Sequence, residues 1–490
     1  MGIKSRRWRA PLALALALLA VQSVAETGRW ADLEGCEFSA AGGRLTESAR
    51  CGTLEVAENP ARPEGRRIEL AYAVTPARAS APRPDPVVFL AGGPGQSARD
   101  MLPMIKRALR DINRDRDLIF VDQRGTGGSN ILDCSFDDSG EVWLEPDLEQ
   151  TNERLRECLA GWDADVRFYT TGHGADDLEA FRREFGIEQF NLIGGSYGTR
   201  MAQVYLRRYP QRVRSVILDG VVPTRLHLGS EHAIMLDRAL EKLFKACERK
   251  QVCAETFPGL SDAFVELKSQ YRDEHRQIVI THPRTGRGFE LEFGADVLAS
   301  ALRFLAYSPE TQMLIPYLVH EAATTGSPER LASQAVIVTD RMSDMIAIGL
   351  NFAVGCSEDW PGWPDDTDAA GTLLGESMKE IYAKVCDWWP SGEVPDDFHQ
   401  PFDSDVPVLI LSGELDPVTP PAYGDEAAAQ FGNSRHLIAE GRGHIVLSNQ
   451  CVATIAAEFV DEASIDDLDT GCMDSIGPEP FFLDLLGPAP

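Results

Sequence analysis

Basic residues are scarce in this chain. Its 490 residues include 47 Lys and Arg against 76 Asp and Glu, which gives a formal net charge of −29. The first 25 residues carry four basic and no acidic side chains, so their removal takes the charge from −29 to −33. Such a charge repels nucleic acid and anionic lipid surfaces. The composition therefore excludes nucleic acid as a partner and indicates a soluble mature protein.

Metal, phosphate and membrane motifs are also missing. No Cys or His group has zinc-ligand spacing and His-Glu-x-x-His is absent, so we expect no metal and no other cofactor. No Gly-Lys-Ser/Thr follows a glycine-rich loop, which excludes an ATPase-type phosphate loop. Beyond residue 25 no run of eighteen apolar residues occurs, so no stable membrane anchor is expected.

The N-terminus has the pattern of a secretory signal peptide. Four basic residues within positions 4–9 precede an apolar run over 11–21, and a small-x-small sequence ends at Ala25. This pattern predicts a signal peptide over 1–25, cleaved after Ala25. No Cys follows the apolar run closely, so a lipid anchor is not expected. The mature protein should be exported to the periplasm or secreted.

Ten cysteines, an even number, indicate disulfide bonds in an exported protein. Spacing alone does not determine how they pair. Near neighbours in the sequence give five candidate pairs: Cys36 with Cys51, Cys134 with Cys158, Cys247 with Cys253, Cys356 with Cys386, and Cys451 with Cys472.

Apolar segments predict an α/β core with one insertion. We expect an irregular, polar stretch over 26–64 and then strands and helices in alternation, which is typical of a parallel sheet covered on both faces. The expected strands lie at 67–74, 86–90, 118–121, 215–220, 406–411 and 435–438, with a further strand starting at 191. The expected helices of this core lie at 148–162, 174–185 and 450–460, with one more after residue 196.

The stretch between 224 and 400 is mostly helical by its pattern, which is typical of an inserted cap. Helices are expected at 230–249, 260–276, 295–307, 310–325 and 329–353, with short strands at 277–281 and 288–293. The predicted organisation is thus a signal peptide (1–25), a first core segment (26–223), a helical cap (224–400), and a second core segment with the C-terminal tail (401–490).

The most informative motif is Gly-Gly-Ser-Tyr-Gly at 194–198, which lies between an apolar strand and a helix. This context predicts a nucleophile elbow, a tight turn that holds Ser196 in a strained conformation above the sheet. Gly194 and Gly198 are expected because a Cβ would collide with the neighbouring strand or helix. A plain glycine-rich turn is the alternative interpretation.

A serine nucleophile needs a base and a group that orients the base. In this fold the chain order is Ser, acid, His, and here it is Ser196, Asp416, His444. Asp416 follows a predicted strand at the sheet edge where α/β proteins place working residues. Glu414 and Asp219 are alternative acids.

The oxyanion of an acyl-transfer intermediate needs two N–H donors. One should be the N–H of Tyr197, the residue after the nucleophile. The second should come from the Gly-Gly-Pro-Gly loop at 92–95, where Pro94 has no N–H, so we expect Gly93. The alternative is that this loop is only a tight turn.

Four motifs together resemble the α/β-hydrolase serine peptidases of the proline iminopeptidase and tripeptidyl aminopeptidase group. They are Ala-Gly-Gly-Pro-Gly at 91–95, Asp-Gln-Arg-Gly-Thr-Gly-Gly-Ser at 122–129, Gly-Gly-Ser-Tyr-Gly-Thr-Arg at 194–200, and Gly-Glu-Leu-Asp-Pro at 413–417. The resemblance covers about 66–225 and 401–450. It implies an α/β-hydrolase fold with a helical cap, and an exopeptidase that acts on peptides with a free N-terminus.

Two departures bear on specificity. Proline iminopeptidases usually have His before Gly-Gly-Pro-Gly and Trp after the nucleophile, whereas this chain has Ala91 and Tyr197. It is more similar to the secreted tripeptidyl aminopeptidases. In the resembling enzymes, acidic residues where the cap returns to the core bind the substrate's amine, and the matching residues here are Glu358 first and Asp359 second.

The resulting prediction is an exported serine exopeptidase that releases one to three residues from short peptides. A carboxylesterase that uses the same triad on small acyl esters is the alternative within hydrolases. A catalytically silent binding module on this fold is the alternative from another class. Neither the number of residues released nor the oligomeric state follows from the motifs.

Overall fold

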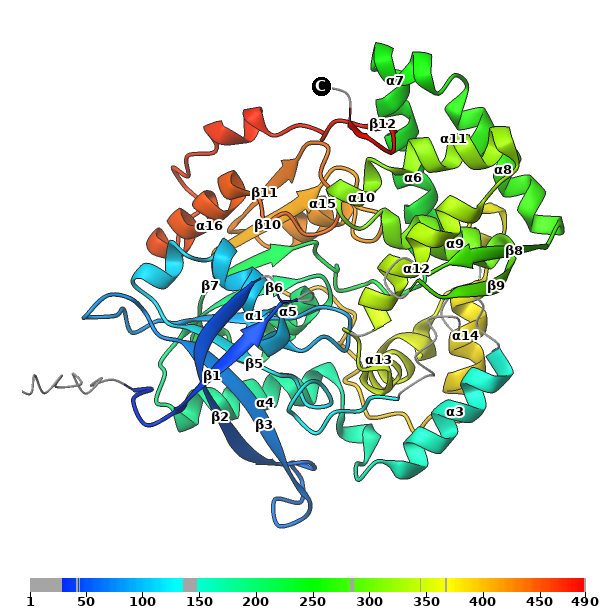
Figure 1. The fold of residues 1–490 in the computed structure, drawn as a ribbon. Coiled ribbons are helices and arrows are strands. Elements are labelled where there is room, and N and C mark those ends of the chain that lie inside the picture. Colours follow the sequence, from blue (N-terminus) through cyan, green and yellow to red (C-terminus); the bar gives the residue numbers. More distant parts are fainter. Residues whose placement is uncertain are drawn as a thin grey trace, which may run out of the picture.

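One large sheet organises the molecule (Figure 1). The computed structural model describes residues 29–488, with gaps at 41–42, 44, 135–147, 283–285, 344 and 366–367. The predicted signal peptide, 1–25, lies outside the described residues. The nine-stranded sheet has the order β1-β2-β3-β5-β4-β6-β7-β10-β11.

The six strands from β5 to β11 in this order are mutually parallel. Each is short and apolar, and side chains alternate between the two faces, as expected of a sheet buried on both sides. The strands are β4 (Val87–Leu90), β5 (Leu118–Val121), β6 (Phe190–Gly195), β7 (Val213–Asp219), β10 (Val408–Gly413) and β11 (Ser434–Ala439). The predicted mostly parallel α/β sheet is therefore confirmed.

The prediction of an irregular stretch over 26–64 was wrong. Strands β1 (Glu34–Ser39) and β2 (Thr46–Ala57) extend the sheet, pairing antiparallel through β3 (Arg67–Thr75) to β5. Their sequences are polar because most side chains of β1 and β2 are exposed or only partly buried at the sheet edge. These strands form because β1 pairs with β2 and β2 pairs with β3, and apolar patterning contributes little, so the pattern alone missed them.

Helices cover both faces of the parallel strands. Val88, Leu192 and Ile410 point to one face, where α4, α5 and α15 pack, while Phe89 and Ile193 point to the other, where α1 and α16 pack. These helices are α1 (Ala98–Ala108), α4 (Thr171–Glu184), α5 (Tyr197–Arg208), α15 (Pro421–Gln430) and α16 (Gln450–Glu462). Within the described residues, none of the helices has both the length and the apolar composition that a membrane span requires.

Between β7 and β10 the chain is mostly helical, and its elements gather on one side of the sheet (Figure 1). Many of its side chains form a hydrophobic cluster separate from those on the sheet faces. The helices are α6 (His232–Glu248), α7 (Gln251–Thr256), α8 (Leu260–Asp273), α9 (Ala295–Leu305), α10 (Pro309–Gln312), α11 (Ile315–Thr325), α12 (Glu329–Ser343), α13 (Ile348–Val354) and α14 (Ser377–Cys386). A small hairpin joins β8 (Arg276–Thr281) to β9 (Gly288–Phe293). Helix α3 (Leu148–Gly161) precedes α4 in the chain and contacts α14.

Two of the predicted helices are each divided into two. The segment expected as one helix over 310–325 forms α10 and α11, and the one expected over 329–353 forms α12 and α13. Before α13 the backbone turns extended at Ala347, whose N–H donates to Gly95 O at 3.0 Å. The second break therefore places the start of α13 against the glycine loop of the core, a contact that helical periodicity does not encode.

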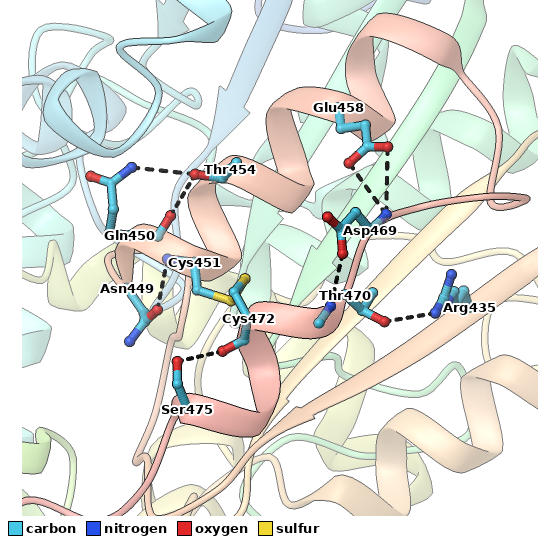
Figure 2. The surroundings of a disulfide bond; sticks show 11 residues. Arg435, Asn449, Gln450, Cys451, Thr454, Glu458, Asp469, Thr470, Cys472 and Ser475 are labelled. Atoms are coloured by element: carbon cyan, nitrogen blue, oxygen red, sulfur yellow. Dashed lines mark hydrogen bonds between the residues drawn. A yellow bond between two sulfur atoms is a disulfide. The ribbon is translucent and has the colours of Figure 1, made fainter.

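Five disulfides join the same near-neighbour pairs that the sequence suggested. Cys36–Cys51 links β1 to β2, and Cys356–Cys386 links η4 (Gly355–Asp359) to α14. Cys451–Cys472 ties α16 to η7 (Gly471–Ser475), as Figure 2 shows. Beyond η7 the tail reaches the predicted cap, where Phe482 N–H donates to Met313 O at 3.1 Å. The number of disulfides fits an oxidising compartment.

Candidate active site

The turn between β6 and α5 holds Ser196 in a strained backbone conformation. Its φ of 55° and ψ of −125° lie outside the regions that non-glycine residues usually adopt, and such strain clusters at active sites. A Cβ at Gly194 would lie 2.4 Å from Gly198 O, and one at Gly198 would lie 2.1 Å from Leu90 O. Glycine is therefore required at both positions, as the sequence predicted.

His444 lies directly against Asp416. The Nδ1–H of His444 donates to Asp416 Oδ2 at 2.8 Å, and Asp416 is only 2% exposed. Thr419 holds the same carboxylate by donating from Oγ1 to Oδ2 at 2.7 Å, and the N–H groups of Val418 and Thr419 donate to Oδ1 at 2.8 Å. These bonds fix the carboxylate, which in turn fixes the imidazole tautomer with a free Nε2.

The neighbouring carboxylate determines the basicity of His444. Burial works to lower the pKa of His444, but the charge of Asp416 and its hydrogen bond outweigh burial and raise that pKa above its usual value. A more basic imidazole is a better acceptor for the proton of a serine hydroxyl.

The two alternative acids have other partners. Glu414 Oε2 accepts from Gly441 N–H at 2.9 Å. The Asp219 carboxylate accepts from the N–H groups of Val446 and Leu447, and burial raises the pKa of Asp219 to about 6. Of the three carboxylates weighed from the sequence, Asp416 is the one that contacts His444.

Asp219 braces both the nucleophile turn and the segment that follows His444. Its carbonyl O accepts from Ser196 N–H at 2.9 Å, while its carboxylate binds Val446 N–H at 3.0 Å. Across the described residues no hydrogen bond joins Ser196 Oγ to His444. In enzymes without substrate such contacts are often long and tighten only in the substrate complex.

The glycine loop after β4 has backbone N–H groups without an acceptor in the described structure, at Gly93 and also at Gly95. Gly92 N–H is used by Gln96 Oε1 at 3.1 Å, and Pro94 has no N–H, whereas in the described structure Gly93 N–H donates to no backbone or side-chain acceptor. Tyr197 is the first residue of α5, where a helix leaves its N–H without an acceptor. Gly93 and Tyr197 therefore both have N–H groups available to an oxyanion.

The motif at 122–129 supports this loop. Asp122 is fully buried and accepts from Ser97 Oγ at 2.8 Å, just after the glycine loop, and from Gly128 N–H at 2.9 Å. Arg124 makes a two-bond pair with Asp177 at 2.6 and 2.7 Å. Both contacts are structural, so this motif positions the loop that carries Gly93.

Glu358 and Asp359 lie together on η4, a π-helical turn, at 3% and 0% exposure. Glu358 accepts from Thr171 N–H at 2.6 Å and from its hydroxyl at 2.7 Å. Asp359 accepts from Arg200 Nη1 at 2.9 Å and from Leu228 N–H at 2.7 Å. An incoming amine would have to displace these bonds. In this structure the pair anchors η4 to α4 and α5.

The same anchor touches the residue after the nucleophile. Tyr197 OH lies 2.6 Å from Thr171 Oγ1 and accepts from Gln123 Nε2 at 3.1 Å. Burial raises the pKa of Glu358 to about 7, and Asp359 acts in the same direction, while Arg200 and Thr171 act to lower it. A buried carboxyl with this pKa is therefore two hydrogen bonds away from the nucleophile turn.

Two contacts at the site were not foreseen. Thr419 holds Asp416, and the available signal was the Asp-x-x-Thr spacing of 416–419, typical of a side chain that caps its own turn. The ring of Tyr307 packs edge-on against His444 with centroids 5.4 Å apart, and Tyr307 O accepts from His444 N–H at 2.9 Å. Nothing local in the sequence indicated Tyr307, because it belongs to the distant helical insertion.

Within the part of the chain that the structure describes, one group of side chains has a composition that could bind a metal ion: His227, Asp359 and His399, whose ligand atoms lie within 4.8 Å of one another. These atoms already have partners in the chain. Asp359 pairs with Arg200, and both ring nitrogens of His399 face backbone carbonyl oxygens at 2.7 and 3.0 Å. The donors thus serve the packing of η4, and no metal is assigned to them.

Two family models match the sequence. The model described as alpha/beta hydrolase fold matches residues 85–249, and the model described as TAP-like protein matches residues 372–472. The first contains the nucleophile turn and the second contains Asp416 and His444.

Curated relatives match over different lengths. Tripeptidyl aminopeptidase of Streptomyces coelicolor is 24% identical over 479 residues, which cover 92% of this chain and 87% of the relative. Serine protease Hip1 of Mycobacterium tuberculosis is 29% identical over 194 residues, which cover 36% of this chain and 37% of the relative. Proline iminopeptidase of Neisseria gonorrhoeae is 28% identical over 137 residues, covering 28% of this chain and 32% of the relative. The match to Hip1 thus spans well under two thirds of that protein.

Proposed function

Because this chain belongs to the α/β hydrolases, in the group of the TAP-like proteins and proline iminopeptidases, we propose that it is an exported serine exopeptidase. Its reaction would release one to three residues from the free N-terminus of short peptides. The observation that carries this proposal is the His444–Asp416 pair beside a strained serine turn. The near-full-length similarity to a tripeptidyl aminopeptidase supports the substrate class.

In the proposed reaction, His444 Nε2 takes the proton of Ser196 as Oγ attacks the scissile carbonyl carbon. The N–H groups of Gly93 and Tyr197 bind the oxyanion that forms. When the C–N bond breaks, His444 gives its proton to the leaving amine, and an acyl-enzyme remains on Ser196. His444 then activates water to hydrolyse this ester, and Asp416 stabilises the imidazolium throughout.

Each oxyanion donor is worth about 3 kcal/mol at the transition state, because it is aimed at a charge that only develops there. The helix start at Tyr197 adds the positive end of the α5 dipole at the same place. The strained turn therefore serves two purposes, since it exposes the Ser196 hydroxyl and orients the donor that follows it.

An exopeptidase must recognise a protonated amine, for which a buried carboxylate is suited. We propose Glu358 as the first partner and Asp359 as the second. Asp359 already has Arg200 as its counter-ion, whereas Glu358 binds only Thr171 at hydrogen-bond distance, with Arg200 at 3.6 Å. An ammonium group near Glu358 would favour its ionised form.

Export rests on two features. The N-terminal 25 residues have the charge and apolar pattern of a signal peptide, and the folded part carries five disulfides. We propose that the helical stretch over 224–400 is the cap of a core formed by 26–223 and 401–490.

The test compares the wild-type protein with Ser196→Ala on a mixed pool of short peptides, followed by mass spectrometry of the products. Wild type should shorten peptides from the N-terminus and react with a fluorophosphonate probe, and Ser196→Ala should do neither. N-acetylated copies of the same peptides should resist cleavage. Turnover of simple acyl esters without any peptide cleavage would favour the carboxylesterase instead.

A further inference from the structure

The end of α9 lies over His444. Tyr307, just past the last residue of this helix, packs its ring against the imidazole and accepts the backbone N–H of His444 at 2.9 Å. Helix α9 ends at Leu305, and Tyr307 follows its C-cap residue, Ala306. In the last turn of α9, Arg303 Nη2 lies 3.4 Å from His232 Nδ1, and the charges of both Arg303 and His444 act on His232. Arg303 therefore lies in the neighbourhood of the His444 imidazole.

Arg303 has no acidic partner. Among the described residues, no carboxylate oxygen lies within 4.0 Å of its guanidinium. Its contacts are Met378 Sδ at 3.4 Å, His232 Nδ1 at 3.4 Å and the Phe304 ring, whose centroid lies 5.6 Å from the guanidinium carbon. Among the described residues, no nitrogen of Arg303 is both buried and without a partner, so the donors of this half-buried guanidinium that these contacts do not use are open to water or to a ligand.

Arg303 thus lacks a carboxylate partner in a chain with 76 acidic and 47 basic residues. Other buried guanidinium groups here have carboxylates at short range: Arg200 lies 2.9 Å from Asp359 and Arg124 lies 2.6 Å from Asp177. Those two side chains are 5% and 1% exposed, whereas Arg303 keeps partial access to solvent. Arg303 can therefore take a carboxylate partner from outside the chain.

The neighbouring imidazole does not offset this charge. Burial, then the charge of Arg303 and then that of His444 lower the pKa of His232 to about 3, so His232 is neutral at working pH. The positive charge of Arg303 thus remains uncompensated close to the catalytic imidazole.

We propose that Arg303 determines specificity by binding a carboxylate of the peptide substrate. This inference rests on the proposed peptidase function. A guanidinium binds a carboxylate through two parallel N–H···O bonds, which gives both affinity and orientation. The carboxylate has two sources in a short peptide: an Asp or Glu side chain near the scissile bond, or the C-terminal α-carboxylate.

The experiment uses three matched peptides that differ only in this group. The first has a Glu near the cleaved bond and an amidated C-terminus, the second has Gln there and a free C-terminal carboxylate, and the third has Gln and an amidated C-terminus. Wild type should cleave the first or the second with a kcat/KM about 10 to 100 times that of the third, the range of a charged hydrogen-bonded pair. The peptide with the higher kcat/KM shows whether Arg303 binds the Glu side chain or the C-terminal carboxylate.

Arg303→Gln should abolish this preference, so that its kcat/KM values for the three peptides lie within about twofold of one another, and its reaction with the fluorophosphonate probe shows that the variant is folded. Arg238→Gln on α6, an exposed position, is the matched control for the change in net charge and should keep the preference. An arginine that only offsets the dipole at the end of α9 would change stability without changing selectivity.

Three results decide the matter. If wild type cleaves all three peptides equally, or Arg303→Gln slows all three equally, the inference about Arg303 is wrong and the peptidase function stands. If wild type cleaves none of a wide peptide pool yet reacts with the fluorophosphonate probe, the peptidase function itself fails and the inference fails with it.

Discussion

Replacing Glu358 with Gln should change how the stability of this protein depends on pH. Glu358 is 3% exposed, and its pKa rises from 4.5 to about 7, chiefly through burial. Both of its oxygens accept hydrogen bonds from Thr171. Gln preserves the size of the side chain and cannot ionise, and the Thr171 hydroxyl can accept from its amide.

The sign follows from proton linkage. A carboxyl with a higher pKa in the folded chain than in the unfolded chain binds more protons when folded, so stability falls as the pH rises between the two values. Here the loss begins near pH 4.5 and is complete above pH 7. At about 1.4 kcal/mol per pKa unit, the free energy of unfolding falls by about 3 kcal/mol over the whole range, of which about 2.5 kcal/mol lies between pH 5 and pH 8.

The assay is urea unfolding followed by tryptophan fluorescence at pH 5 and pH 8, with the disulfides intact. In wild type the Glu358 contribution adds to that of every other titrating group. From pH 5 to pH 8 wild type loses about 2.5 kcal/mol of unfolding free energy through Glu358, and Glu358→Gln should not lose it. The change in unfolding free energy over this range should therefore be about 2.5 kcal/mol more stabilising in the variant than in wild type. Glu153→Gln, at an exposed position on α3, is the matched control and should follow wild type.

An identical pH dependence in wild type and Glu358→Gln would refute the argument that burial controls this carboxyl. The same variant tests the proposed amine contact. If Glu358 binds the substrate amine, Glu358→Gln should raise KM for peptides with a free N-terminus and leave the turnover of acyl esters unchanged. If Glu358 only anchors η4, Glu358→Gln should instead lower kcat for peptides and esters alike.

Other consequences concern the imidazole and a disulfide. Asp416→Asn should lower kcat about 10⁴-fold by disturbing the tautomer of His444. His444 must be neutral to act as a base, and its pKa is raised, so wild-type activity should disappear as the pH falls through that pKa. Asp416→Asn should move this acidic limb of the kcat/KM profile to lower pH. An unmoved limb would contradict the assignment of Asp416. Replacing Cys451 and Cys472 together with Ser should lower the unfolding free energy by about 3 kcal/mol, and by more than the same change at Cys247 and Cys253, because the first pair closes a loop of 21 residues and the second one of 6. Equal losses in the two double variants, measured by urea unfolding, would speak against this explanation.

The parallel strands and the nucleophile turn could be predicted because their causes are local. A buried strand needs only a short apolar run, and a turn that brings two backbones within touching distance needs glycine at 194 and 198. The strands β1 and β2 could not be predicted in this way, since β1 is held by pairing with β2 and β2 by pairing with β3, and their exposed side chains carry no apolar signal.

The carboxylates also divide into what local sequence could predict and what depends on distant segments. Chain order and the position after a strand favoured Asp416, yet only the fold shows that Thr419 holds it and that Asp219 and Glu414 bind backbone N–H groups instead. For Glu358 and Asp359 the sequence could not reveal Arg200 and Thr171, which lie more than 150 residues away along the chain.

By itself, then, the sequence determined the α/β-hydrolase core, and it predicted the reacting groups: a serine held between glycines, with an acid and a histidine in the order of a hydrolase. Only the tertiary structure decided which charges are neutralised inside the chain and which, like Arg303, are left for a ligand. The reason is physical, because the energy of a buried charge depends on the partners that folding brings to it from distant segments.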